Sequence, residues 1–75
     1  MSKKSELKKA IADSEKEIEM LEKKRMRSQS AILEAYINKD TPNESDAEYF
    51  RVYTSLIELE RANLRKLNEE LDKLK

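Results

Sequence analysis

The sequence predicts an all-α protein, an antiparallel two-helix hairpin of the coiled-coil type, and three observations favour this fold. The chain of 75 residues has no glycine and one proline, Pro42, so it offers one place for a sharp reversal. Charged residues make up 43% of the chain, as is typical of long helices. Apolar residues recur at heptad spacing on both sides of Pro42. We expect one domain over residues 1–75, with helices at about 3–38 and 45–74 and a corner at 39–44.

The first helix carries one line of residues at the a and d positions of a heptad repeat, which we call its seam. Most seam residues are apolar, although Ser14, Arg25 and Ser28 interrupt the pattern. In a straight helix the a and d positions rotate by about 20° per heptad relative to the partner helix. The sequence therefore leaves open whether the same seam positions still face the second helix after Arg25. The seam consists of Leu7, Ile11, Ser14, Ile18, Leu21, Arg25, Ser28, Ile32 and Ala35.

The corner contains competing signals for the start of the second helix. Thr41 with Glu44 matches a capping box that has proline at the first helical position. Ser45 with Glu48 matches a second box one turn later, so the sequence leaves both starts open. Asn38 is the residue that we expect to end the first helix in a left-handed conformation.

The second helix has a more regular seam, in which only Glu60 is polar. In an antiparallel pair an a residue faces a d residue, so the numbers of facing residues have a constant sum, here about 85. This register sets small residues against large ones, for example Ser14 against Leu71, as close packing prefers. The seam consists of Phe50, Tyr53, Ile57, Glu60, Leu64, Leu67, Leu71 and Leu74.

The same register sets Arg25 opposite Glu60, the charged residues of the two seams. An opposite-charge pair inside a seam can fix register and orientation at some cost in stability, so we predict that these residues form an ion pair that sets the register. The alternative is that both side chains extend their charged groups to water. The register also brings Glu22 close to Arg61.

A second set of apolar residues lies outside the seams, near the corner. One seam rarely stabilises so small a chain, so we expect these side chains to be covered in a homodimer whose corner halves form a four-helix bundle, or by an unidentified protein partner. The heptad wheel places the two helices' groups on opposite sides of the hairpin. They are Met26, Leu33, Tyr36 and Ile37 in the first helix and Tyr49, Val52, Leu56 and Leu59 in the second.

The composition argues against most kinds of chemistry. The chain has neither histidine nor cysteine, which removes the usual general base, thiol nucleophile and soft metal ligands. The lack of glycine removes phosphate-cradling loops. We therefore expect no enzymatic activity, no cofactor and no metal. No segment reaches the about 18 apolar residues of a membrane span, and the first residues lack a signal peptide's apolar stretch, so we expect a cytoplasmic protein.

Two functions fit these features. The favoured one is a non-enzymatic protein–protein interaction or assembly module, formed by a homo-oligomeric hairpin. The alternative is a small nucleic-acid-binding regulator that uses basic residues in the middle of the hairpin. Against it, Lys plus Arg and Asp plus Glu each total 16, and no aromatic residue lies among the basic ones to stack on a base. The candidate contacts are Lys23, Lys24 and Arg27 in the first helix and Arg61 and Arg65 in the second.

Overall fold

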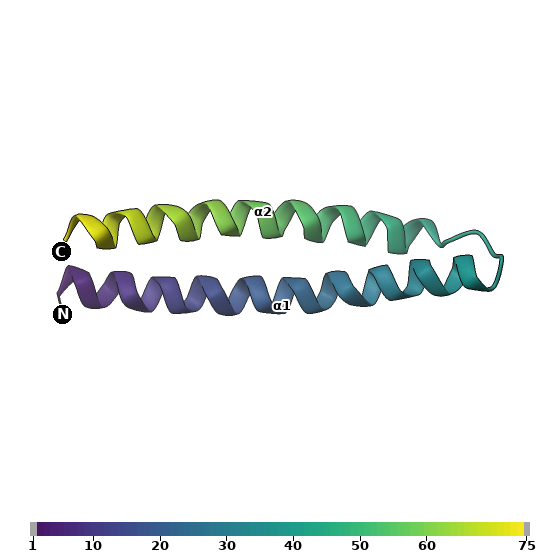
Figure 1. Cartoon of the computed structure of the whole chain (residues 1–75), viewed down its shortest axis with the longest axis horizontal. Helices are drawn as coiled ribbons and strands as arrows, with labels where there is room; N and C mark the ends of the chain where they lie inside the picture. Colours follow the sequence, from purple (N-terminus) through teal and green to yellow (C-terminus); the bar gives the residue numbers. More distant parts are fainter. Residues whose placement is uncertain (1, 75) are drawn as a thin grey trace.

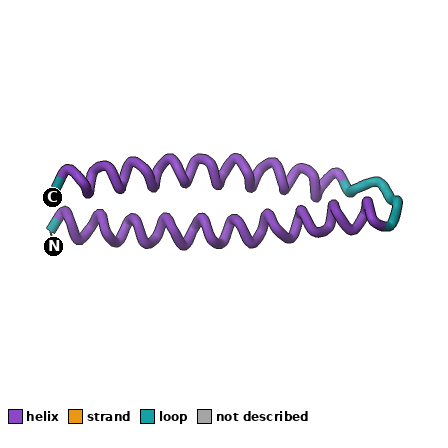
Figure 2. The backbone as a smooth tube through the Cα atoms, viewed as in Figure 1, coloured by secondary structure: helices purple, strands orange, loops and turns teal. Residues whose placement is uncertain are grey.

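The structure, a computed structural model that describes residues 2–74, confirms the all-α hairpin. Helix α1 spans Lys3–Ile37 and helix α2 spans Glu44–Lys73, and residues 2–74 contain no strand. The helices run antiparallel, side by side along their whole length (Figure 1), in a rod of 55 × 15 × 15 Å. The corner forms one end of the rod and both chain ends lie at the other, the open end (Figure 2).

Asn43, and neither Thr41 nor Ser45, caps the start of α2. Its side-chain Oδ1 accepts a hydrogen bond from the amide of Ser45 at 2.8 Å, and its backbone is extended, with φ −66° and ψ 133°. Asparagine is among the strongest capping residues, and its carbonyl oxygen reaches the second helical amide. Both predicted capping boxes are therefore wrong, and α2 begins at Glu44.

The end of α1 is closed by a Schellman motif. The amide of Asp40 donates to the carbonyl of Ala35 at 2.8 Å, and the amide of Lys39 donates to that of Tyr36 at 3.0 Å. This pattern requires a left-handed residue, which is Lys39 with φ 58°. The prediction that Asn38 would take this role is wrong, because Asn38 has φ −83° and is still on the helix side of the motif.

Replacing Lys39 with glycine is expected to stabilise the hairpin by about 0.5–1 kcal/mol. A left-handed backbone brings Cβ close to the following carbonyl oxygen, and glycine lacks Cβ, although part of the gain is lost to glycine's freedom in the unfolded chain. Urea denaturation at a fixed protein concentration measures the change. Lys39→Ala is the control, because it removes the charge and keeps Cβ. An equal gain in both variants would show that the backbone conformation is not the cause.

The seams predicted from the heptads are the residues that the helices bury. Every α1 seam residue is buried or half-buried, and so is every α2 seam residue except Leu74. Ile18, Leu21 and Ile57 form the central cluster, against which Tyr53 and Leu64 pack. Ser28 is buried, whereas Leu33 and Ile37 are exposed, so the α1 register does not drift after Arg25.

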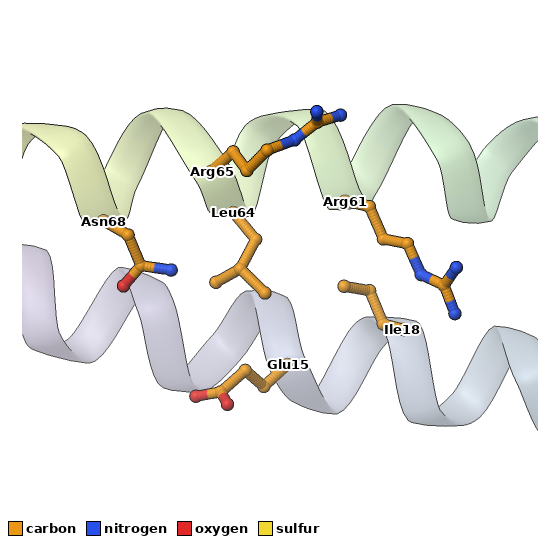
Figure 3. Close-up of a pocket in the computed structure, with 6 residues that line it drawn as sticks. All are labelled: Glu15, Ile18, Arg61, Leu64, Arg65 and Asn68. Carbon is orange, nitrogen blue, oxygen red and sulfur yellow. The ribbon is translucent and has the colours of Figure 1, made fainter.

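The predicted facing sum of about 85 is wrong, because the helices pair about one heptad away from it. Ile57 packs with Ile18 and Leu21 and does not face Ser28, so facing residues sum to about 78. Figure 3 agrees, since Ile18 lies level with Arg61.

Arg61 Nη2 donates to Glu22 Oε2 at 3.4 Å, which confirms that these residues are neighbours. Arg25 and Glu60 are both half-buried, but within residues 2–74 no hydrogen bond or ion pair joins them. In the observed register Arg25 and Glu60 are offset by about one heptad, roughly 10 Å along the helices, so the prediction that they face each other is wrong. The alternative, that both charged groups extend to water, fits this offset.

The core of the hairpin is small and contains one unpaired polar group. Among the described residues the buried apolar side chains are Leu7, Ile18, Leu21 and Ile57. Ser14 is also buried, and its Oγ has no hydrogen-bond partner. One pair of helices therefore covers only a narrow line of side chains.

Candidate interaction surface

A line of four exposed apolar side chains runs along the corner half of α2, and we call it the α2 stripe. Their spacing of three, four and three residues places them on one face of the helix. The stripe consists of Tyr49, Val52, Leu56 and Leu59, which are 54%, 41%, 40% and 69% exposed. All four were singled out from the sequence as candidate interface residues.

The α2 stripe is anchored to the core at its corner end. The ring of Tyr49 stacks on that of Tyr53, with centroids 6.1 Å apart and planes inclined by 23°. Tyr53 is half-buried and packs against the central cluster. A surface aromatic ring that rests on a core ring has less freedom to lose on binding, which favours its use in a contact.

Helix α1 has its own exposed apolar group, which we call the α1 stripe. It is less regular than the α2 stripe, since polar residues separate its members. In heptad terms the α1 stripe lies at b, e and f positions, whereas the α2 stripe lies at g and c positions. Because e and b positions flank one side of an antiparallel pair and g and c positions the other, the two stripes face different sides of the rod. The α1 stripe consists of Met26, Leu33, Tyr36 and Ile37.

A shallow groove crosses between the helices in the open-end half, away from both stripes (Figure 3). Ile18 and Leu64 lie between the two helices there, and Arg61 extends from α2 toward α1. Glu15 and Asn68 also line the groove. Arg61 contacts Glu22, so the groove holds charges of both signs and is no concentrated anion site.

The basic residues predicted as nucleic-acid contacts do not form one patch. Arg61 and Arg65 line the groove of Figure 3 together with Glu15, whereas Lys23 and Arg27 line a separate hollow on α1 with Glu34. Lys24 is exposed at a g position, on the side of the rod opposite the e position of Arg61. The nucleic-acid role of these residues stays a prediction.

Opposite charges already accompany part of this basic set. Lys23 Nζ lies 3.3 Å from Glu19 Oε1, and Arg61 is paired with Glu22. Binding a phosphate would therefore compete with a carboxylate at both residues, which weakens the electrostatic term on which nucleic-acid binding depends.

No known protein family, curated protein or solved structure matches this chain. Within residues 2–74 no group of three or more acidic, histidine or cysteine side chains is placed to hold a metal ion. Neither described helix contains a stretch apolar and long enough to cross a bilayer.

Among the described residues, two large exposed apolar side chains were not among the predicted interface residues. Met20 is 44% exposed on α1, and Leu74 is exposed although the heptads place it in the seam. Leu74 lies just beyond the last helical residue, where little of α1 remains to cover it. Met20 follows no apolar neighbour at three- or four-residue spacing on its face, so the sequence pattern carried no signal for it.

Proposed function

We propose that this protein is a self-associating assembly module, a hairpin that pairs with a second copy through its corner half to form a four-helix bundle. One observation carries the proposal: within the described residues the two stripes expose more large apolar side chains than the hairpin buries. Contiguous exposed apolar groups are typical of surfaces that contact another protein.

The size of the core supports the proposal. A fully buried aliphatic side chain contributes about 1.5–3 kcal/mol. Among the described residues four apolar side chains are buried, and of these Ile57 alone is fully buried. Ordering each residue costs about 1.5 kcal/mol, so chains of this size usually require a disulfide, a metal or a second chain. This chain has no cysteine, and association through α2 covers the α2 stripe without any further component.

The electrostatics support a partner of the same kind. The chain has a formal net charge of +0, so two copies do not repel one another at long range. Both stripes lack charged residues. A second copy therefore offers an apolar, uncharged surface to the apolar surface of the first.

The proposal is tested by measuring the mass of the protein in solution. Sedimentation equilibrium at micromolar concentrations is expected to give twice the chain mass of 8.9 kDa for the wild type. Leu56→Glu is expected to give the mass of one chain, because a carboxylate at the centre of the α2 stripe would have to lose its hydration in the interface. The wild-type mass should change little between low and high salt, since burial of apolar surface is not screened.

Ala12→Glu is the matched control, since it adds the same charge to an exposed position in the open-end half. It is expected to keep the mass of the wild type. A wild-type protein of single-chain mass across the concentration range would refute self-association. Equal masses for Leu56→Glu and the wild type would refute the involvement of the corner half.

A further inference from the structure

Given the proposed self-association, we infer its geometry: α2 packs antiparallel against α2 of the second copy, with the two-fold axis passing between Val52 and Leu56. The α2 stripe is self-complementary about this axis. Val52 faces Leu56 of the second copy, and Tyr49 faces Leu59. The two-fold axis repeats each of these contacts with the two copies exchanged. A two-fold interface requires this property, because the same surface must match itself.

Polar residues mark both ends of the stripe in the same register. The next positions at helical spacing are Ser45 before Tyr49 and Asn63 after Leu59, and both are exposed. The axis sets Ser45 of one copy opposite Asn63 of the other, where hydroxyl and amide groups form hydrogen bonds with one another or with water. Apolar layers therefore meet apolar layers, and polar layers meet polar layers.

Other pairings of the same two helices fit less well. A shift by one heptad in one direction sets Leu56 against Ser45, and in the other it sets Val52 against Asn63. Either shift covers fewer apolar side chains and leaves a polar group against an apolar one. A parallel pair would also match apolar residues but would place the helix dipoles side by side in the same direction, which is unfavourable.

The charges at the edge of the stripe are neutralised within each copy. Arg51 Nη2 donates to Glu48 Oε2 at 2.7 Å, and these residues line one surface hollow with Val52 and Leu56. The edge of the stripe therefore does not repel an identical helix, and it does not favour a partner with a net positive or a net negative charge.

Distances between spin labels test this geometry, and the chain suits the method because it has no natural cysteine. Ser55→Cys, Ala62→Cys and Glu69→Cys each place one label per copy at exposed positions one heptad apart on the same face of α2. With the axis at the level of residue 54, the label-to-label distance is expected to be under about 20 Å at Ser55. The component of this distance along the helices should then grow by about 21 Å with each heptad, since each residue adds about 1.5 Å on both sides of the axis.

Each other result overturns the inference in a distinct way. Equal distances at all three positions would show a parallel pair. A short distance from Ser30→Cys on the outer face of α1, with long ones on α2, would show that α1 carries the contact. Both results leave the proposed self-association standing. A single-chain mass in sedimentation, with no dipolar coupling from any label, would overturn the self-association as well.

Discussion

Replacing Ile57 with alanine is expected to destabilise the hairpin by about 3 kcal/mol, the largest effect that we expect from one substitution. Ile57 has 0% of its surface exposed and packs with Ile18 and Leu21 at the centre of the seam. Its loss leaves a cavity in the middle of a two-helix interface that has few other buried apolar contacts. Thermal unfolding followed by circular dichroism measures the change, at one protein concentration because association contributes to stability.

Met20→Ala is the control for the loss of side-chain volume in a helix. Met20 is 44% exposed and belongs to neither stripe, so its replacement is expected to change the free energy of unfolding by less than about 0.5 kcal/mol. Similar losses in the two variants would contradict a core centred on Ile57.

Replacing Ser14 with alanine is expected to stabilise the hairpin by about 1–2 kcal/mol. The Oγ of Ser14 is buried without a hydrogen-bond partner, and such a group retains the cost of its lost hydration. Alanine removes that group and also has a higher helix propensity than serine, by about 0.5 kcal/mol. Urea denaturation of the wild type and the variant measures the difference.

Ser28→Ala separates these two contributions, because both serines are buried seam residues of α1. The Oγ of Ser28 donates to the carbonyl of Lys24 at 3.5 Å, so its removal gains helix propensity but gives up a hydrogen bond. A smaller gain is expected for Ser28→Ala than for Ser14→Ala. The same gain at both positions would mean that the unpaired hydroxyl has no effect of its own.

The fold and its seam could be predicted from the sequence because burial in a helix pair follows heptad spacing. The pattern identified even Ser14 and Ser28 as buried, since position rather than side-chain chemistry decides which residues face the other helix. The exposure of the two stripes followed from the same pattern. The role of the stripes in binding could not be predicted from the heptad pattern, because exposed apolar residues do not identify the protein that covers them.

The ends of the helices were predicted less well, because their capping depends on a few backbone angles. Thr41, Asn43 and Ser45 are all good capping residues within one turn, and the structure uses Asn43. Lys39 is left-handed only because the Schellman hydrogen bonds require a residue at that point. The heptad pattern repeats every seven residues, so it could not distinguish the predicted register from the observed one, which is about one heptad away and keeps Arg25 and Glu60 apart.

The position of both chain ends at one end of the rod decides how the protein can be tethered (Figure 1). A tag or surface linkage at either end is separated from the corner by most of the 55 Å length, so it leaves the two stripes accessible. In the inferred two-fold pair the open ends point in opposite directions, roughly 60 Å apart. Proteins fused to this chain would therefore lie at the two opposite ends of a short rod-shaped dimer.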